Sequence, residues 1–477
     1  MGFNNKRFGD WEKDGGIKDV FGASPNMNLQ YNRLQGCNGI TETSIRTANT
    51  TYSYVGSIIN VPADHATISA AIAAASSGDI IQIADGTYLT SAESAGYLLI
   101  NDTKNLLIRG NASDNTAVKI SQNAVSGFGV RIRKSGNVTF QDLTITSNQA
   151  ANAVYQQFRD TGSSPTKVIC DNCIIENTAA STATTIIVSA VANVCYTEFN
   201  ECVLTANSSS GSYVIDFSVI SDAQKAANAA PILITESTIN GEVRCGDSAI
   251  DLTMYNNTLT QSFYDSSYIL SIGSDTTAPT NSASVLDIRG NTFQYVGFCG
   301  HAVLLGRGTK DIYMVNNTIN IPASTNVLAL GIVMKSIAAI VGDVIVSGNI
   351  VTAPRPLYIK GGQNCKVQYN CGVSNWDDLT FGYGFEVNNP DNPDGVINST
   401  GNIVTNNSLI GKIGGIALSK DAAAGSPKTS VLTGNFDYNT YQVLTGNTYV
   451  DNEGIPVLWS GRDAFWSLDK NSQFIEL

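Results

Sequence analysis

The sequence carries little charge, few histidines and no long apolar run. Charged residues make up 14% of the 477 residues, and only two histidines are present. No uninterrupted apolar stretch approaches the roughly 18 residues that a membrane-spanning helix needs. Lysine and arginine number 28 against 40 aspartate and glutamate residues, which gives a formal net charge of −12. This balance argues against nucleic acid and against an anionic membrane surface as partners, because both attract clusters of basic residues.

Cysteine usage supports neither a disulfide framework nor a metal site. Nine cysteines are present, an odd number without an even set of close pairs, so a disulfide scaffold is not expected. Cys170 and Cys173 form one CxxC, but no second CxxC or nearby histidine completes a zinc set. We therefore expect buried free thiols and predict no cofactor; calcium is left open, without a motif that supports it.

The first 56 residues differ from the rest of the chain. Residues 1–10 are polar and lack the apolar core of a secretory signal, so we expect either a removed signal or assembly in a cytoplasm. Residues 1–56 have no regular apolar period, yet they contain scattered large aromatics such as Trp11 and Phe21. Disordered segments usually lack such residues. An irregular N-terminal arm that packs on its own chain or on a partner is predicted, with disorder as the alternative.

A short sequence motif recurs along most of the chain. Residues 252–259, 286–293 and 312–319 each read as alternating apolar residues, a turn residue and two β-formers. Aligned on the turn residue, the copies recur every 20 to 35 residues along most of the chain. A period of this size with two-residue alternation inside it is typical of a stacked β-solenoid, in which each coil buries its apolar face against its neighbours.

Asparagine occupies the turn position in many copies of the repeat. Identical residues of stacked coils lie above one another, and asparagine amides can then hydrogen-bond along the stack. The other aligned positions include Leu143, Cys173, Cys202, Ser237, Asn370 and Asn435. The predicted structural ladder consists of Asn111, Asn257, Asn291, Asn317, Asn349 and Asn402.

A short capping helix is predicted at residues 66–76, ahead of the first coil. Ile68 and Ile72 belong to an apolar stripe at helical spacing. Asp64 is the expected capping residue at its start, and Gly78 is the expected stop at its end.

The residues around this helix carry a resemblance to a known family. Val61-Pro62, the alanine-rich helix, Gly78-Asp79 and the Asp-Gly-Thr-Tyr of residues 85–88 resemble the opening of the pectin-lyase-like superfamily, which includes polysaccharide lyases, polygalacturonases and phage tailspikes. The resemblance runs from about residue 57 to 449, and the aromatic segment 450–477 is similar to the family's closing segment. It implies an all-β fold, a single-stranded right-handed parallel β-helix of about a dozen coils at residues 57–449 with a C-terminal cap at 450–477.

The catalytic motifs of the family's enzymes are incomplete. A polygalacturonase resemblance would need four motifs in a fixed order, whereas the fragments at 131–133, 300–302 and 377–378 occur in the wrong order. A pectate-lyase resemblance would need a calcium-binding acidic cluster and an arginine base. Arg355-Pro356 has no such cluster before it, so no intact catalytic motif is found.

A second strand in each coil supplies the candidate binding residues. When the apolar positions of this strand are aligned, the alternating residues point outward. The outward candidates are Arg131, Arg133, Asp216, Lys335, Tyr358, Lys360 and Glu386. The last four are expected within two coil steps of one another, where two lysines about 5 Å apart require an anion or a carboxylate. This predicts a carbohydrate-binding patch for an acidic sugar, with tyrosine and lysine able to abstract a proton; a solvated face or a subunit contact is the alternative.

Three functions are consistent with these features. The first is a phage tailspike-like virion appendage that binds host-surface polysaccharide and whose depolymerising activity is left open. It is expected to be a homotrimer located in the virion and joined to other virion proteins through residues 1–56. The alternative is a secreted polysaccharide lyase or glycoside hydrolase, and the second alternative is a non-catalytic structural or adhesive surface protein.

Overall fold

The computed structural model describes a large part of the solenoid region of the chain. The described residues are 54–101, 104–123, 128–134, 136–149, 154–157, 167–179, 184–188, 196–206, 213–217, 231–246, 250–262, 268–272, 285–296, 301–305, 311–323, 329–335, 343–360, 365–376, 383–388, 403–405, 407–411, 414–418, 430–433, 436–439, 443–444 and 466–468. The chain divides into two compact units, Met1–Tyr54 and Val55–Leu477. The predicted arm at 1–56 lies outside the described residues except for its last three.

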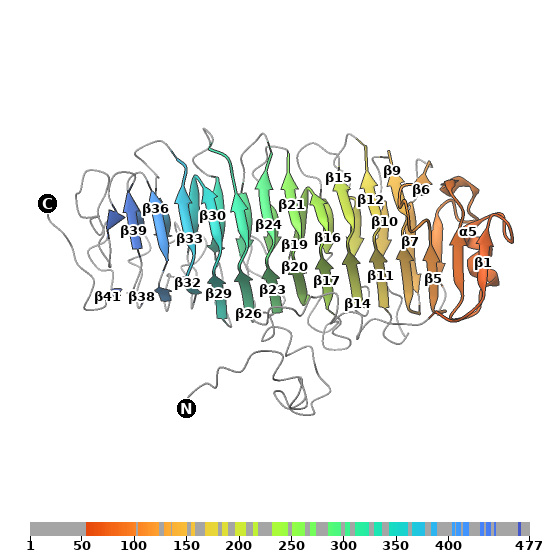
Figure 1. Ribbon diagram of the computed structural model, residues 1–477, viewed down its shortest axis with the longest axis horizontal. Helices are drawn as coiled ribbons and strands as arrows, with labels where there is room; N and C mark the ends of the chain where they lie inside the picture. Colours follow the sequence, from red (N-terminus) through yellow and green to blue (C-terminus); the bar gives the residue numbers. More distant parts are fainter. Residues whose placement is uncertain are drawn as a thin grey trace, which may run out of the picture. The chain divides into compact units, whose positions relative to one another are not determined.

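Three long sheets build the second unit, and the chain visits them in a fixed order. Apart from the two ends of the solenoid, each coil contributes one strand to sheet A, one to sheet B and one to sheet C, so a strand pairs with the strands three places before and after it in the chain. All pairs in the described strands are parallel except the last pair of sheet B. The predicted parallel β-helix is confirmed, and Figure 1 shows its coils stepping from one end to the other.

Sheet A has 15 strands. They are β1 (Ile58–Val61), β2 (Ile80–Ile83), β5 (Leu106–Arg109), β8 (Val138–Gln141), β11 (Lys167–Asp171), β14 (Tyr196–Asn200), β17 (Ile232–Thr235), β20 (Leu252–Tyr255), β23 (Val285–Arg289), β26 (Asp311–Val315), β29 (Asp343–Ser347), β32 (Cys365–Gln368), β35 (Ile403–Thr405), β38 (Ser430–Thr433) and β41 (Trp466–Leu468). Since β41 pairs in register with β38, the C-terminal segment contributes a strand to the solenoid.

Sheet B has 14 strands. They are β3 (Gly86–Leu89), β6 (Val118–Gln122), β9 (Thr144–Ser147), β12 (Ile174–Asn177), β15 (Val203–Ala206), β18 (Thr238–Asn240), β21 (Thr258–Gln261), β24 (Thr292–Tyr295), β27 (Thr318–Asn320), β30 (Ile350–Ala353), β33 (Cys371–Ser374), β36 (Ser408–Gly411), β39 (Phe436–Asn439) and β40 (Val443–Leu444).

Sheet C has 12 strands. They are β4 (Leu98–Asn101), β7 (Val130–Lys134), β10 (Tyr155–Gln157), β13 (Ile186–Val188), β16 (Tyr213–Phe217), β19 (Glu242–Gly246), β22 (Tyr268–Ile272), β25 (His301–Leu305), β28 (Leu330–Lys335), β31 (Arg355–Lys360), β34 (Tyr383–Asn388) and β37 (Gly414–Leu418).

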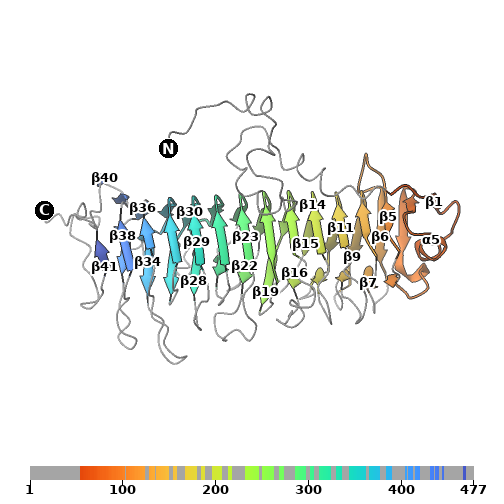
Figure 2. The ribbon, with the colours of Figure 1, turned by 90° about the horizontal axis from the view of Figure 1, so that it is seen from below.

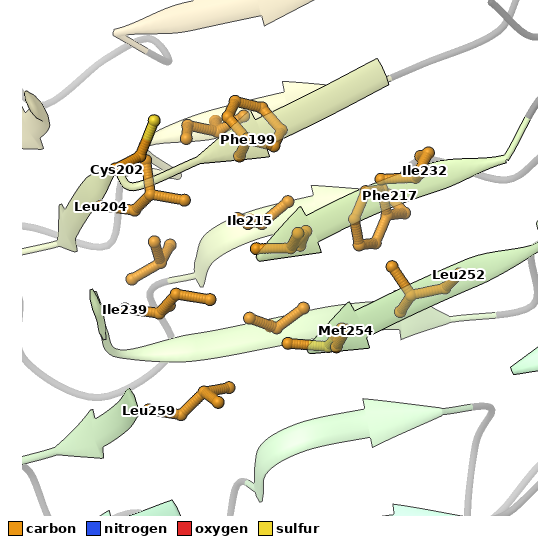
Figure 3. Packing of buried hydrophobic residues seen from close by; sticks show 14 of the residues in the cluster. Phe199, Cys202, Leu204, Ile215, Phe217, Ile232, Ile239, Leu252, Met254 and Leu259 are labelled. Carbon is orange, nitrogen blue, oxygen red and sulfur yellow. The ribbon is translucent and has the colours of Figure 1, made fainter. Parts of the chain in front are cut away.

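One apolar core runs inside the three sheets. Alternation along each strand sends every second side chain inward, so residues such as Phe199, Phe217 and Met254 are almost fully buried. Figure 3 shows side chains from successive coils meeting in the interior. In-register stacking thus keeps the core continuous from coil to coil.

A short helix, α5 (Ile68–Ala74), covers the start of the solenoid. Ile68 and Ile72 are buried as expected, but the capping residues differ from the prediction. Thr67 is the N-cap, and its hydroxyl accepts from the Ala70 amide. The Asp64 carboxylate instead accepts from the Asn60 amide at 2.7 Å, because it lies too far before the first turn to reach it.

Side chains distant in sequence hold both ends of α5. The Glu93 carboxylate accepts from the amides of Ile68 and Ser69 at 3.2 and 2.9 Å. The Lys104 ammonium donates to the carbonyls of Ile72 and Ala73 at 3.2 and 3.1 Å. An anion at the helix start and a cation at its end satisfy backbone groups that a short helix leaves open. The helix ends at the C-cap Ala75 rather than at Gly78.

The turn between sheet A and sheet B is a two-residue turn with a repeated geometry. Its first residue has a positive φ in most coils, for example 55° at Asn256 and 67° at Gly348. Asparagine and glycine tolerate this conformation at low cost. The second residue of the turn then points inward, and this is the ladder position.

Six asparagines form a continuous buried ladder at that second position. In the first five, the amide nitrogen donates to the Oδ1 of the next asparagine at 2.9–3.0 Å, and the backbone N–H donates to the same oxygen. Each Nδ2 also donates to a carbonyl of the preceding coil, as Asn317 does to Ile288 at 3.0 Å. These polar side chains are therefore satisfied inside the core. The ladder is Asn257, Asn291, Asn317, Asn349, Asn370 and Asn407.

One asparagine predicted for the ladder, Asn111, makes a different contact. Asn111 stands at the equivalent turn position, but its Nδ2 donates to the Asp85 carboxylate at 3.0 and 3.2 Å. The next coils hold Leu143 and Cys173 there, which offer no amide to continue the chain of hydrogen bonds. The rung after Asn370 is Asn407, and Asn402 lies outside the described residues.

Within the described part of the chain, no helix has the length and apolar character to cross a membrane.

Replacing Asn317 with alanine should lower the free energy of unfolding by about 2–4 kcal/mol, because it leaves buried donors and acceptors of two coils unsatisfied. Chemical denaturation followed by circular dichroism measures the change. Asn320→Ala is the matched control, since Asn320 is exposed at the end of β27. Equal losses for the two variants would show that the ladder contributes no special stability.

Candidate functional site

The predicted patch at the C-terminal end of sheet C has the expected register. Val333, Tyr358 and Glu386 are neighbours on β28, β31 and β34, and Lys335 pairs with Lys360. Neighbouring strands lie roughly 4.8 Å apart, so the four predicted residues Lys335, Tyr358, Lys360 and Glu386 share a small area of the sheet. The side chains of Lys335, Lys360 and Glu386 lie outside the described part of the structure.

Tyr358 is buried, which differs from its predicted role on an open surface. It is 5% exposed and packs with Leu304, Leu330 and Val333 in a small apolar cluster on the outer side of sheet C. The Arg355 guanidinium lies 4.5 Å from the centre of the Tyr358 ring. A cation held over an aromatic face is stabilising, and this arrangement gives Tyr358 a packing role within the sheet.

Arg131 and Arg133 lie at the other end of sheet C. Their strand, β7, is eight strands from β31, a separation of roughly 38 Å. Arg131 donates to the Tyr97 hydroxyl at 3.4 Å, and its guanidinium lies 5.0 Å from the centre of the Phe128 ring. The structure therefore does not bring the two arginines together with Lys360.

Asp216 also lies apart from the predicted patch. Its strand, β16, is five strands from β31, or roughly 24 Å. The register instead places it directly beside Arg244 of β19. Figure 2 shows β16, β19 and β22 side by side in the middle of the sheet.

Asp216 and four neighbouring side chains form what we call the central cluster: Tyr213, Asp216, Glu242, Arg244 and Ser271. Arg244 is exposed, and its guanidinium lies 4.8 Å from the centre of the Tyr213 ring. Beneath it, Ser271 donates its hydroxyl to the buried Glu242 carboxylate at 3.1 Å. A shift of register between β16 and β19 places Glu242 opposite Tyr213. The cluster presents one exposed cation among carboxyl, phenol and hydroxyl groups.

Burial and charge act in opposite directions on the acids of the central cluster. Loss of hydration raises the pKa of Asp216, and the positive charge of Arg244 opposes that rise. Burial also raises the pKa of Tyr213, again opposed by Arg244 and reinforced by the charges of Glu242 and Asp216. Both groups thus hold their protons to higher pH than in water, as proton donors at functional sites do.

An aromatic pair adjoins the central cluster. Tyr268 and His301 are register neighbours, and their rings stack with centres 4.8 Å apart. The Leu330 amide donates to the His301 Nδ1 at 3.2 Å, so Nδ1 is the nitrogen without a proton and a neutral ring carries its hydrogen on Nε2. The pair offers half-buried ring surface and one imidazole N–H.

Sequence reasoning missed most of this site. Of the central cluster only Asp216 was a candidate, and His301 was considered only as a fragment of a motif. A usable signal was present in Glu242 and Arg244, two charged residues that alternate with apolar ones in a solenoid strand. Charged residues are rare in this sequence, so such a pair on one strand is notable.

The described residues give no indication of a metal centre. They contain no group of three or more histidine, cysteine, aspartate or glutamate side chains that could hold a metal ion. Their six cysteines are free, and five of them are buried. Burial raises the pKa of Cys365 to about 12, so that thiol stays protonated and is a poor metal ligand.

Comparisons with known proteins gave matches among solved structures only. No family model matches the chain, and no curated protein matches it. The chain is similar to the PL6 family alginate lyase AlyGC, with 12% identity and a TM-score of 0.44 over 88% of this chain and 53% of that one. It is also similar to a mannuronic acid specific polysaccharide family 6 lyase from human gut microbiota, with 12% identity and a TM-score of 0.43 over 77% and 83% of the two chains. The match thus spans about half the length of AlyGC.

Asp216→Asn should raise the melting temperature at pH 7. Folding raises the pKa of Asp216 above 3.8, the value of a free aspartate. The carboxyl group therefore gives up its proton less readily in the folded chain than in the unfolded chain, and the folded protein loses stability as the pH rises from below the unfolded-state pKa to above the folded-state pKa. The asparagine variant avoids that loss, so its advantage should shrink towards pH 3. Thermal unfolding across this pH range measures it.

Asp114→Asn is the contrasting control for this prediction. Hydrogen bonds from Thr116 lower the pKa of Asp114, so its charged form is favoured by folding and the substitution should bring no gain at pH 7. The quantity to compare is the melting temperature of Asp216→Asn minus that of the unchanged protein. A smaller difference at pH 7 than at pH 3 would contradict the prediction.

Proposed function

We propose that the outer face of sheet C binds an acidic polysaccharide. The observation that carries this proposal is the distribution of charge among the strands the structure describes. Strands of sheet C contain seven lysine and arginine residues against three aspartate and glutamate residues. The corresponding numbers are four against five in sheet A and one against two in sheet B. In a chain of net charge −12, sheet C is the face to which an anionic ligand is attracted.

The central cluster supplies groups suited to a sugar acid. A guanidinium binds a carboxylate through two parallel hydrogen bonds, and Arg244 is exposed for this contact. Asp216 and Tyr213 are half-buried beside it and offer further hydrogen bonds to hydroxyl groups. The Tyr268–His301 pair adds ring surface against which the apolar side of a sugar can pack.

The setting we propose for this activity is a virion appendage that attaches to host-surface polysaccharide. Residues 1–56 would join other virion proteins, and the chain would assemble as a homotrimer. Support comes from the resemblance to a superfamily that contains phage tailspikes and from the aromatic content of the arm. A secreted polysaccharide lyase or glycoside hydrolase is the alternative setting, and a structural or adhesive surface protein is the second.

Arg244→Ala should weaken binding to soluble polyuronates about tenfold, the effect of losing one charged hydrogen-bonding group. Isothermal calorimetry with polygalacturonate and polymannuronate measures the affinity, which should also fall with added salt because exposed charges are screened. Lys119→Ala is the matched control, since it removes one positive charge from sheet B. Wild-type affinity for Arg244→Ala, or equal binding of a neutral glucan, would refute the proposal.

Cleavage of the bound chain is a second candidate function, favoured by the raised pKa of Asp216 and Tyr213 beside an exposed guanidinium. Arg244 would neutralise the sugar carboxylate, and a protonated neighbour would donate to the leaving oxygen. In a lyase an ionised neighbour would take the C5 proton as the C4–O bond breaks, and in a hydrolase water would add at C1 as the C1–O bond breaks. The enzyme would then be a polysaccharide lyase or a glycoside hydrolase.

Product assays on polyuronates distinguish these outcomes. A lyase gives products with unsaturated-sugar absorbance, whereas a hydrolase gives reducing ends without it. Tyr213→Phe and Asp216→Asn should each reduce the rate at least a hundredfold if these groups transfer protons, while Lys119→Ala leaves it unchanged. Tight binding with neither product would establish a non-catalytic binding face.

A further inference from the structure

Seven consecutive strands of sheet B, from β15 to β33, contain no charged residue. Six strand steps separate the two ends of this stretch, a distance of roughly 29 Å. Figure 1 shows β15, β21, β24 and β30 in one row along the solenoid. Charged side chains hold a strong hydration shell of their own, so a neutral face of this length is suited to a neutral partner.

The outward side chains of this stretch repeat in two rows. In the first row, four threonines are register partners on four consecutive strands. In the second row, two residues further along each strand, hydroxyl and amide side chains occupy six consecutive strands. All of these side chains are half-buried or exposed, and we call them the threonine face. They are Thr238, Thr258, Thr292 and Thr318 in the first row, and Thr205, Asn240, Thr260, Gln294, Asn320 and Thr352 in the second.

The threonine face is regular and held in place. Its strands pair without a register shift, whereas β16 and β19 of sheet C contain one. The residue between the two rows is buried in every strand, as Leu259 and Phe293 are. The Asn240 Nδ2 donates to the Thr205 Oγ1 at 3.0 Å, and the Thr260 hydroxyl donates to the Asn240 Oδ1 at 2.6 Å. Threonine also has few side-chain rotamers, so the positions of its hydroxyl and methyl groups repeat from coil to coil.

The repeat distance of the threonine face is close to that of ice. Stacked coils place equivalent hydroxyls roughly 4.8 Å apart. In ice each water molecule makes tetrahedral hydrogen bonds with an O···O distance of about 2.75 Å, so two oxygens that share a neighbour lie about 4.5 Å apart. The difference is about 0.3 Å per coil, or about 0.5 Å at each end of a row of four centred on the lattice. A small rotation about χ1 provides a displacement of this size.

We propose that the threonine face binds ice. The threonine methyl groups restrict the orientation of the water molecules beside them, and the hydroxyl groups fix those molecules by donating and accepting hydrogen bonds. Water held at the threonine spacing continues into the lattice of an ice surface. The proposal concerns a face other than sheet C and is independent of the proposed polysaccharide function.

The composition of the threonine face disfavours two other occupants. A sheet-on-sheet contact with a second copy would place apolar side chains at its centre, whereas every side chain of the two rows carries a hydroxyl or an amide. A neutral polysaccharide packs its apolar side against aromatic rings, whereas the aromatic residues of these strands, Phe293 and Tyr295, are buried. Hydroxyl and methyl groups at a fixed spacing favour ordered water.

The first test measures the behaviour of the full chain in ice. The unchanged protein should become enriched in a slowly growing polycrystalline ice front, relative to an inert globular protein in the same solution. It should also stop the growth of single ice crystals at temperatures just below their melting point, which a nanolitre osmometer measures. No enrichment and no growth arrest would overturn the proposal without needing any variant to fold.

Thr258→Tyr tests the threonine face itself. Thr258 lies between Thr238 and Thr292 in the first row, so a tyrosine ring there rises above the neighbouring side chains and breaks the contact with a flat lattice. The variant should lose most of the growth arrest and most of the enrichment in ice. Tyrosine is favoured in strands, and circular dichroism with the melting temperature shows whether the solenoid is retained.

Thr253→Tyr is the matched control. Thr253 is half-buried on β20 of sheet A, in the same coil as Thr258, so the same side chain is introduced on a different face. This variant should keep the full growth arrest and the full enrichment. Equal losses for the two variants would overturn the assignment to the threonine face.

Two further measurements distinguish the other occupants. Sedimentation of the unchanged protein with microcrystalline cellulose, without enrichment in ice, would assign the face to a neutral polysaccharide. A dimer in light scattering that Thr258→Tyr separates into monomers would assign the face to a second copy. Either outcome overturns the proposal.

Discussion

The structure depends on in-register stacking of parallel strands. Every strand of a coil gives its backbone hydrogen bonds to the coils before and after it, so no coil is complete alone. The consequence reaches the side chains, because residues separated by one coil of sequence become neighbours at strand distance. Asn291 and Asn317 are 26 residues apart and share a hydrogen bond. Asp216 and Arg244 become electrostatic neighbours in the same way.

This constraint also explains why the fold could be predicted from the sequence. A stacked position must accept the same environment in every coil, so its chemistry repeats, and asparagine after a left-handed turn residue is easy to recognise. The last rung shows the limit of that pattern. Gly401-Asn402 resembles Gly290-Asn291, whereas Asn406-Asn407 resembles Asn256-Asn257 and is the pair whose second residue continues the ladder. Both pairs fit the sequence rule, and only the register of β35 with β32 distinguishes them.

The candidate site was harder to predict because its properties arise between coils. The alignment of β28 with β31 could be read from the sequence, and the structure has the same register. The register of β16 with β19 contains a shift at Tyr213 and Ile215, which no repeat pattern reveals. Nor does sequence alternation indicate that Tyr358 is buried on the outer side of its sheet, since that burial depends on Leu304 and Val333 in the two preceding coils.

Net charge is a poor guide to partners in a protein of this architecture. A total of −12 argues against an anionic ligand only if charge is spread evenly over the surface. A solenoid separates its surface into three faces, and each face repeats its own strand along the whole stack. Sheet C can therefore be positive while the chain is acidic. The described strands of sheets A and B each carry a net charge of −1, against +4 for sheet C, so sheet C is the face whose charge suits the anionic ligand that we propose.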